Sequence, residues 1–166
     1  MYVRDICSNA PLLAARNELD FFHQDRCLVS SRVTAFESYC GMTNSSSQLL
    51  RTAFWLRDRF CALAGVRPIN GFAQERPKAS PVAGDVVDFF KVDYITNDEL
   101  FLVANDRHLC VLVALMLSPA LGLKRELTIT ASVKTHNLFG KVYMVPVAYA
   151  HGLIVRRMLR QLTSRA

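Results

Sequence analysis

The stretch SVKTHNLFGKVYMVPVAYAHG, residues Ser132–Gly152, joins an alternating polar and apolar pattern to a long, nearly unbroken apolar run. Three polar residues, Thr135, His136 and Asn137, stand at the junction. Asn is a favoured N-cap residue because its side-chain oxygen accepts a hydrogen bond from a backbone N–H of the first helical turn. The junction therefore predicts a strand that ends with Thr135 facing inward and His136 outward, and a helix that begins after Asn137.

The predicted helix runs from Leu138 almost to Ser164. Apolar residues recur at helical spacing and predict the face that packs on the sheet: Leu138, Val142, Val145, Tyr149 and Gly152. Pro146 lacks a backbone donor and crowds the preceding turn, so it should bend the helix. Gly152 carries no side chain, which should permit a close approach.

The segments before the junction predict antiparallel strands. Residues Val86–Ile95 and Leu100–Ala104 flank a Thr96–Asp98 turn and read as a hairpin. His108–Leu117 is apolar at both parities, which indicates a strand covered on both sides. Glu126–Lys134 alternates most clearly. Its inward residues are Leu127, Ile129, Ala131 and Val133, and its outward residues are Glu126, Thr128, Thr130, Ser132 and Lys134.

The first half of the chain is less regular. Glu18–Ser30 reads as a first strand, and Ser30 and Ser31 could cap a short helix that reaches about Met42. A second helix should begin at Gln48 and end at Gly65. Residues 67–84 contain three prolines and two glycines, which predicts a loop that is either a flap or a concealed strand. We therefore expect an α+β fold in which a curved antiparallel sheet wraps around a long C-terminal helix, with two shorter helices after the first strand.

Composition indicates one domain spanning residues 1–166, with 1–18 as an N-terminal extension. The chain is 51% apolar, but no stretch meets the criterion of roughly 18 apolar residues for a membrane helix. The first residues lack the order of a secretory signal, so we expect a cytoplasmic protein. Five cysteines without a close pair favour reduced thiols over disulfides or a zinc cluster.

The net charge of +6 does not by itself predict nucleic-acid binding. Aromatic residues do not interleave with the basic ones as they do in a base-stacking surface. Four arginines cluster near the C-terminus: Arg156, Arg157, Arg160 and Arg165. They favour an interaction with the negative end of a helix dipole, and the alternative is contact with anionic lipid or RNA.

Three segments resemble the bacterial domain-of-unknown-function family 2867, in the same order and at similar spacing. They are LRTAFWLRDRFCALAGV, DELFLVANDRHLCVLVALML and LTITASVKTHNLFGKVYMVPVAYAHGLIVRRMLRQ. The resemblance covers about Leu49 to Leu162. It implies a START-like, helix-grip (polyketide cyclase-like) fold that encloses a cavity.

Two features separate this chain from such relatives. Some of them carry a nicotinamide-cofactor-binding domain, but the sequence has no Gly-x-Gly-x-x-Gly segment, so we expect no cofactor. Relatives also have polar residues about where this chain has Cys110 and Leu112. That apolar face predicts cover by another segment or by a partner, which makes a homodimer plausible.

Several ionisable residues are candidates for a site. Arg107 could hold an acidic head group at a cavity mouth, or it could extend outward beside a turn made by Asp106. His108 and His151 are weak catalytic candidates, and each is more simply a hydrogen-bonded structural histidine. A metal site that joins them to His136 lacks close ligand spacing, so we expect no metal.

These residues favour a module that binds an apolar small molecule in a cavity between the sheet and the C-terminal helix. The expected ligand-binding residues are Arg107, Val111, Val113, Ile129, Val133, Tyr149 and Leu153. The alternatives are a cyclase-like or isomerase-like enzyme that uses a cavity histidine, and an oligomeric packing protein without a ligand. We expect no nucleic-acid partner and no membrane span.

Overall fold

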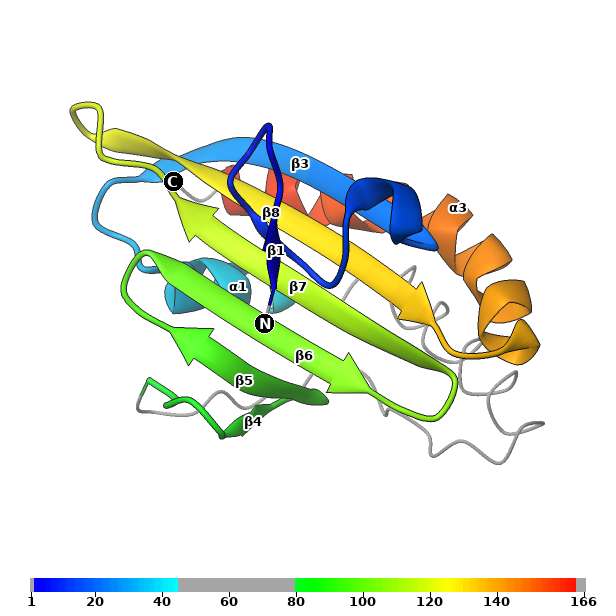
Figure 1. Ribbon diagram of the computed structural model, residues 1–166. Coiled ribbons are helices and arrows are strands. Elements are labelled where there is room, and N and C mark those ends of the chain that lie inside the picture. Colours follow the sequence, from blue (N-terminus) through cyan, green and yellow to red (C-terminus); the bar gives the residue numbers. More distant parts are fainter. Residues whose placement is uncertain (1, 45–79, 164–166) are drawn as a thin grey trace.

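The computed structural model describes residues 2–44 and 80–163, and it shows an α+β fold with an antiparallel sheet and a long C-terminal helix, as predicted (Figure 1). The six-stranded sheet has the order β3-β8-β7-β6-β5-β4. Its strands are β3 (Phe21–Ser30), β4 (Val86–Val87), β5 (Phe90–Ile95), β6 (Glu99–Asn105), β7 (Leu109–Leu117) and β8 (Lys124–Thr135). The helices are α1 (Ala35–Thr43) and α3 (Leu138–Thr163). A short hairpin of β1 (Val3–Arg4) and β2 (Pro11–Leu12), followed by the 3-10 turn η1 (Arg16–Glu18), precedes β3.

Strand β8 lies between β3 and β7 and fixes which side chains share a face. Its pairing with β3 places His23 opposite Ala131, and its pairing with β7 places Val113 opposite Ala131 as well. Odd-numbered residues of all three strands face the helices, and several of them, including Val29, Leu115 and Leu127, join the main core together with Val155 from α3. Even-numbered residues form the outer face of the sheet.

The N-terminal segment covers this outer face, so the strand β7 is covered on both sides, as its sequence predicts. Leu112 is fully buried, and Tyr2 and Leu13 pack against its cluster. Cover therefore comes from another segment of the same chain. The expectation that Thr130 and Ser132 face water is wrong, because the N-terminal segment buries both residues.

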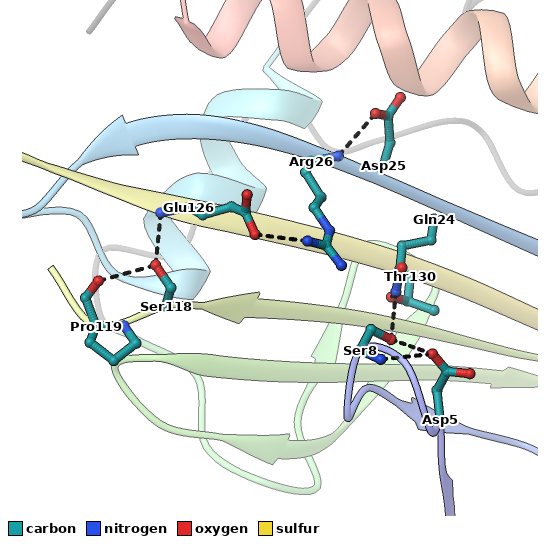
Figure 2. Close-up of polar contacts among 9 residues, drawn as sticks. All are labelled: Asp5, Ser8, Gln24, Asp25, Arg26, Ser118, Pro119, Glu126 and Thr130. Carbon is teal, nitrogen blue, oxygen red and sulfur yellow. Dashed lines mark hydrogen bonds and ion pairs between the residues drawn. The ribbon is translucent and has the colours of Figure 1, made fainter. Parts of the chain in front are cut away.

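Polar side chains attach the N-terminal segment to the sheet (Figure 2). Gln24 donates hydrogen bonds to Ser8 Oγ at 2.8 Å and to Thr130 Oγ1 at 2.9 Å. The carboxylate of Asp5 accepts from Ser8 Oγ at 2.6 Å and pairs with Arg16 Nε at 2.8 Å. These bonds satisfy polar groups whose burial would otherwise destabilise the fold.

Two predicted elements differ in detail. The single strand expected over Val86–Ile95 is divided into β4 and β5 at Asp88, whose φ of 58° makes a tight turn. A bulge follows between Val92 and Tyr94, and Tyr94 is 43% exposed whereas Phe90 and Val92 are buried. The β5–β6 hairpin itself is confirmed.

Helix α1 is capped by Thr34, not by Ser30 or Ser31. Thr34 Oγ1 accepts from Glu37 N at 3.1 Å, and the Glu37 carboxylate accepts from Thr34 N at 2.8 Å. This is a complete capping box, which the sequence carries as Thr-x-x-Glu. The helix predicted from Gln48 to Gly65 lies outside the described residues, as does 67–79 of the predicted loop.

The joint between β8 and α3 is as the polar triplet predicts. Asn137 Oδ1 accepts from Gly140 N at 3.0 Å and so caps the helix, while His136 is exposed. Pro146 lies inside α3, and Figure 1 shows the helix curving as it passes from the end of β8 to the length of β3.

The face of α3 expected to meet the sheet is instead exposed. Exposed fractions of Leu138, Val142, Val145 and Tyr149 lie between 63% and 87%. The buried residues of α3 are Gly140, Met144, Val155, Met158 and Leu159. Both faces of the helix are apolar, so periodicity alone could not identify the packed one. By length and mean hydropathy over 18 residues, α3 is also apolar enough to cross a membrane, although Lys141 and His151 interrupt its apolar run.

The close approach expected at Gly152 occurs at Gly140. A Cβ atom at Gly140 would collide with the backbone carbonyl of His108, whereas one at Gly152 would lie 3.6 Å from the His23 ring, an ordinary contact.

We expect Gly140→Ala to lower the free energy of unfolding by about 1–3 kcal/mol, because the backbone must shift to admit the methyl group. Gly152→Ala is the matched control and should be neutral or raise stability by about 0.5–1 kcal/mol, since alanine favours the helix. Urea denaturation of both variants measures the difference. Equal effects of the two substitutions would contradict the close approach at Gly140.

Candidate functional site

Two histidines face each other between the sheet and α3. The ring centroids of His23 on β3 and His151 on α3 are 5.2 Å apart, at an interplanar angle of 72°. The ring of Phe21 lies 5.2 Å from that of His151 and meets it edge-on. We call His23 and His151 the histidine pair, and Phe21 is its aromatic neighbour.

Strand parity and helix spacing bring these residues together. Phe21 and His23 are odd-numbered residues of β3 and therefore face α3, opposite Val133 and Ala131 of β8. His151 lies on the packed side of α3, four residues before the buried Val155. The site therefore depends on the register of β3 as much as on the orientation of the helix.

Burial keeps both imidazoles neutral. Loss of solvation lowers the pKa of His151 to about 4, and the neighbouring His23 contributes to the shift. Burial also lowers the pKa of His23, where the Asp25 carboxylate acts in the opposite direction and Arg156 adds to the lowering. At neutral pH each ring is therefore uncharged and has one donor and one acceptor nitrogen.

One nitrogen of each ring has no hydrogen-bond partner among the residues that the structure describes. These atoms are His23 Nε2 and His151 Nδ1, and both are buried. A buried polar atom left without a partner costs about 1–3 kcal/mol. A ligand that bonds to both nitrogens would recover part of this cost.

An apolar surface adjoins the histidine pair. Val111 pairs with Val133, and Val113 pairs with Ala131, in the same two rows of the sheet as Phe21 and His23. Val111 and Val113 are half-buried, whereas Ile129 and Val133 are buried. The structure thus brings four of the expected ligand-binding residues to one side of the sheet: Val111, Val113, Ile129 and Val133.

The other three expected ligand-binding residues lie elsewhere. Tyr149 and Leu153 are 87% and 60% exposed on the opposite side of α3. Arg107 is exposed in the loop between β6 and β7, where its Nε donates to His108 Nε2 at 2.8 Å. None of these three side chains is at the histidine pair.

His108 belongs to a polar cluster that joins the β6–β7 loop to the start of α3. Because its Nε2 accepts from Arg107, its Nδ1 carries the proton and donates to Asn137 Oδ1 at 3.2 Å. Asn137 Nδ2 donates to the Arg107 carbonyl at 3.1 Å, and Asp106 accepts from the backbone N–H of Leu109 at 3.0 Å. Both nitrogens of His108 therefore have partners within this cluster, in contrast to those of the histidine pair.

The side chain of His136 does not contact the histidine pair. Its Nε2 is 3.2 Å from Asn105 Oδ1, and its side chain is exposed. Within residues 2–44 and 80–163, no group of three or more His, Cys, Asp or Glu side chains is arranged to hold a metal ion.

The sequence identified His151 as a catalytic candidate, but it assigned no role to His23. The alternation Phe21–His23–Asp25 was the available indication that His23 shares a face with Phe21. The shared face could not be recognised from the sequence, because charged and apolar residues of this strand mix at both odd and even positions.

A family model described as "Protein of unknown function (DUF2867)" matches residues 16–158. This range includes β3, β8 and both members of the histidine pair. Comparisons with curated proteins and with solved structures give no match.

The neutral histidine pair predicts a loss of stability between pH 6.5 and about 4. The unfolded chain binds protons below its ordinary histidine pKa of about 6.5, whereas the folded His151 binds one only near pH 4, so unfolding gains protons as the pH falls. We expect the free energy of unfolding to fall on the order of 2 kcal/mol between pH 7 and pH 4.5 from this residue.

Urea denaturation at the two pH values tests this expectation. His151→Phe should reduce the loss, and His136→Gln should not change it. Asp5 and Asp20 act in a separate window, because hydrogen bonds from Ser8 and Thr135 lower the pKa of their carboxyls and their contribution is lost only below about pH 4. An unchanged loss in His151→Phe would contradict the burial of a neutral imidazole.

Proposed function

The chain belongs to the family described as protein of unknown function (DUF2867), and we propose that it binds an apolar small molecule with a hydrogen-bonding head between the sheet and α3. The observation that carries this proposal is the pair of facing imidazoles, each with a buried and unpartnered nitrogen. A START-like, helix-grip architecture is part of the proposal, since α3 follows the last strand and lies along β3 on one side of the sheet.

The head group should contact His23 and His151. Both rings are neutral, so each can offer either an N–H donor or a lone-pair acceptor to the ligand. A hydroxyl, a carbonyl or a protonated acid could bridge nitrogens on rings whose centroids are 5.2 Å apart. An anion would gain less here, because neither ring is positively charged at neutral pH.

The apolar body should lie against the half-buried side chains of β7. Val111 and Val113 are partly exposed on the side of the sheet that carries the histidine pair. Burial of their remaining surface would stabilise a complex by about 25 cal/mol per Å² of apolar area. Ligand sites are commonly apolar with a few polar groups that fix orientation, and this arrangement has that composition.

We expect protein purified from its own host to retain a small molecule in native mass spectrometry, and His151→Phe to lose most of it. Phenylalanine keeps the edge-on contact with Phe21 but removes the bonding nitrogen, so the fold should be preserved or become more stable by about 1 kcal/mol. The control is His136→Gln, which should retain the molecule. A bare mass for the wild-type protein, or equal retention by His151→Phe, would overturn the proposal.

A second candidate is a cyclase-like or isomerase-like enzyme in which His151 carries a proton. It is favoured by one observation: His151 lies inside the fold beside a second polar group, His23. His108 does not meet this condition, because both of its nitrogens are bonded.

Incubation of the retained molecule with the protein in D₂O separates the two candidates. An enzyme that moves a proton at carbon should introduce deuterium at a carbon position, and His151→Phe should abolish the exchange. A binding module should leave every carbon-bound hydrogen unchanged.

A further inference from the structure

Helix α3 presents a continuous apolar row to the surroundings. We call this row the outer row of α3; its residues are Leu138, Val142, Val145, Tyr149 and Leu153. All five are between 60% and 87% exposed. They follow one another at spacings of three or four residues, so they lie on one face of the helix. A contiguous exposed apolar surface of this kind commonly marks a contact with a partner or a membrane.

Basic residues continue and flank the outer row. Arg156 and Arg160 follow Leu153 at the same spacing, so the row ends in two guanidinium groups. Lys141 and Arg157 lie beside it, and all four basic side chains are exposed. The sequence of α3 contains no Asp or Glu in its 26 residues. The helix thus contributes only apolar and cationic side chains to this face, and one carboxylate, that of Asp25 on β3, pairs with Arg156 at its edge at 3.9 Å.

The opposite face of α3 is attached to the sheet, so the helix cannot cross a bilayer while the fold is intact. Met144, Val155 and Met158 are buried, and His151 packs against β3. Only 17% of the most apolar 18-residue window of α3 is buried, in contrast to the core helix of a soluble protein. A helix with one attached face and one apolar, cationic face is suited to lie in the plane of a membrane surface.

We propose that the outer row of α3 inserts into the surface of an anionic membrane, with Arg157 and Arg160 bound to lipid phosphates. The positive charge of this face of α3 favours anionic lipid over a second copy of the chain as its partner. A second copy of this chain would present arginines to arginines, because α3 contains no Asp or Glu and the nearby Asp25 of β3 already pairs with Arg156 at 3.9 Å. Anionic lipid offers both the apolar layer that the row requires and the phosphates that the arginines bind. The inference is independent of the proposed ligand site, which lies on the other side of α3.

Co-sedimentation with vesicles tests the proposal. The full chain should bind vesicles of equal parts phosphatidylglycerol and phosphatidylcholine, and bind phosphatidylcholine alone far more weakly. Tyr149→Asp should lower the partition coefficient about tenfold or more, because it places a charge in the apolar row. The matched control is Leu121→Asp, since Leu121 is 86% exposed on the β7–β8 turn.

A second pair of variants separates the charge from the apolar row. The double substitution Arg157→Gln and Arg160→Gln should lower the partition coefficient about 25-fold, at about fivefold for each arginine. Lys91→Gln removes an exposed cation on β5, near the opposite edge of the sheet from β3 and α3, and should have little effect. Far-ultraviolet circular dichroism establishes that each variant is folded.

Three outcomes would overturn the proposal. The first is equal binding to neutral and anionic vesicles. The second is unchanged binding by Tyr149→Asp. The third is a dimer in sedimentation velocity that Tyr149→Asp dissociates, because it would show that a second copy occupies the outer row.

Discussion

Strand β8 hydrogen-bonds to β3 on one side and to β7 on the other, and the placement of the remaining side chains depends on this double pairing. A shift of one residue would exchange the two faces of a strand. His23 would then point at the N-terminal segment, and Gln24 would point at α3. The facing imidazoles, the half-buried valines and the polar anchor of the N-terminal segment therefore share one cause, which is the register of a single central strand.

The same register places two unpartnered ring nitrogens, one from His23 and one from His151, between β3 and α3. Apolar atoms at these two positions would make the protein more stable. His23 lies on the same face of β3 as Phe21, and the rings of both residues lie 5.2 Å from that of His151. On the outer face of the sheet, buried polar groups are bonded: Thr130 accepts from Gln24, and Ser132 Oγ accepts from Leu13 N. On the side of α3, the buried atoms His23 Nε2, His151 Nδ1 and Thr135 Oγ1 have no hydrogen-bond partner among the described residues, in contrast to the bonded ring nitrogens of His108.

Much of the architecture could be predicted from local patterns. Asn137 identifies the start of α3, and the alternation in 126–134 and the two-sided apolar run in 109–117 identify the strands of the centre. The predictions of which face of β8 is exposed to water and which face of α3 packs on the sheet were wrong. Thr130 and Ser132 looked like solvent positions because nothing local reveals that residues 2–13 cover them. The outer row of α3 looked like a packed face because a helix that is apolar on both sides has no periodicity that distinguishes them.

The candidate site was harder to predict than the fold, since it is assembled from segments distant in sequence. His23 lies on β3, which pairs with β8, and His151 lies on α3, which follows β8. No local sequence pattern at either histidine indicates that the other lies next to it. Four valine and isoleucine positions on β7 and β8 were correctly placed on one side of the sheet because strand parity is a local property. Tyr149 and Leu153 were not, because helix orientation is set by contacts with β3.

The order of strands also governs how the chain must assemble. Strands β4 to β8 follow one another by short turns, but β3 pairs with a strand whose residues come about a hundred positions later, as Phe21 does with Val133. Closing such a long loop carries an entropic cost that the local hairpins do not have. During synthesis, β3 therefore leaves the ribosome long before β8, its sheet neighbour among the described residues, has been made.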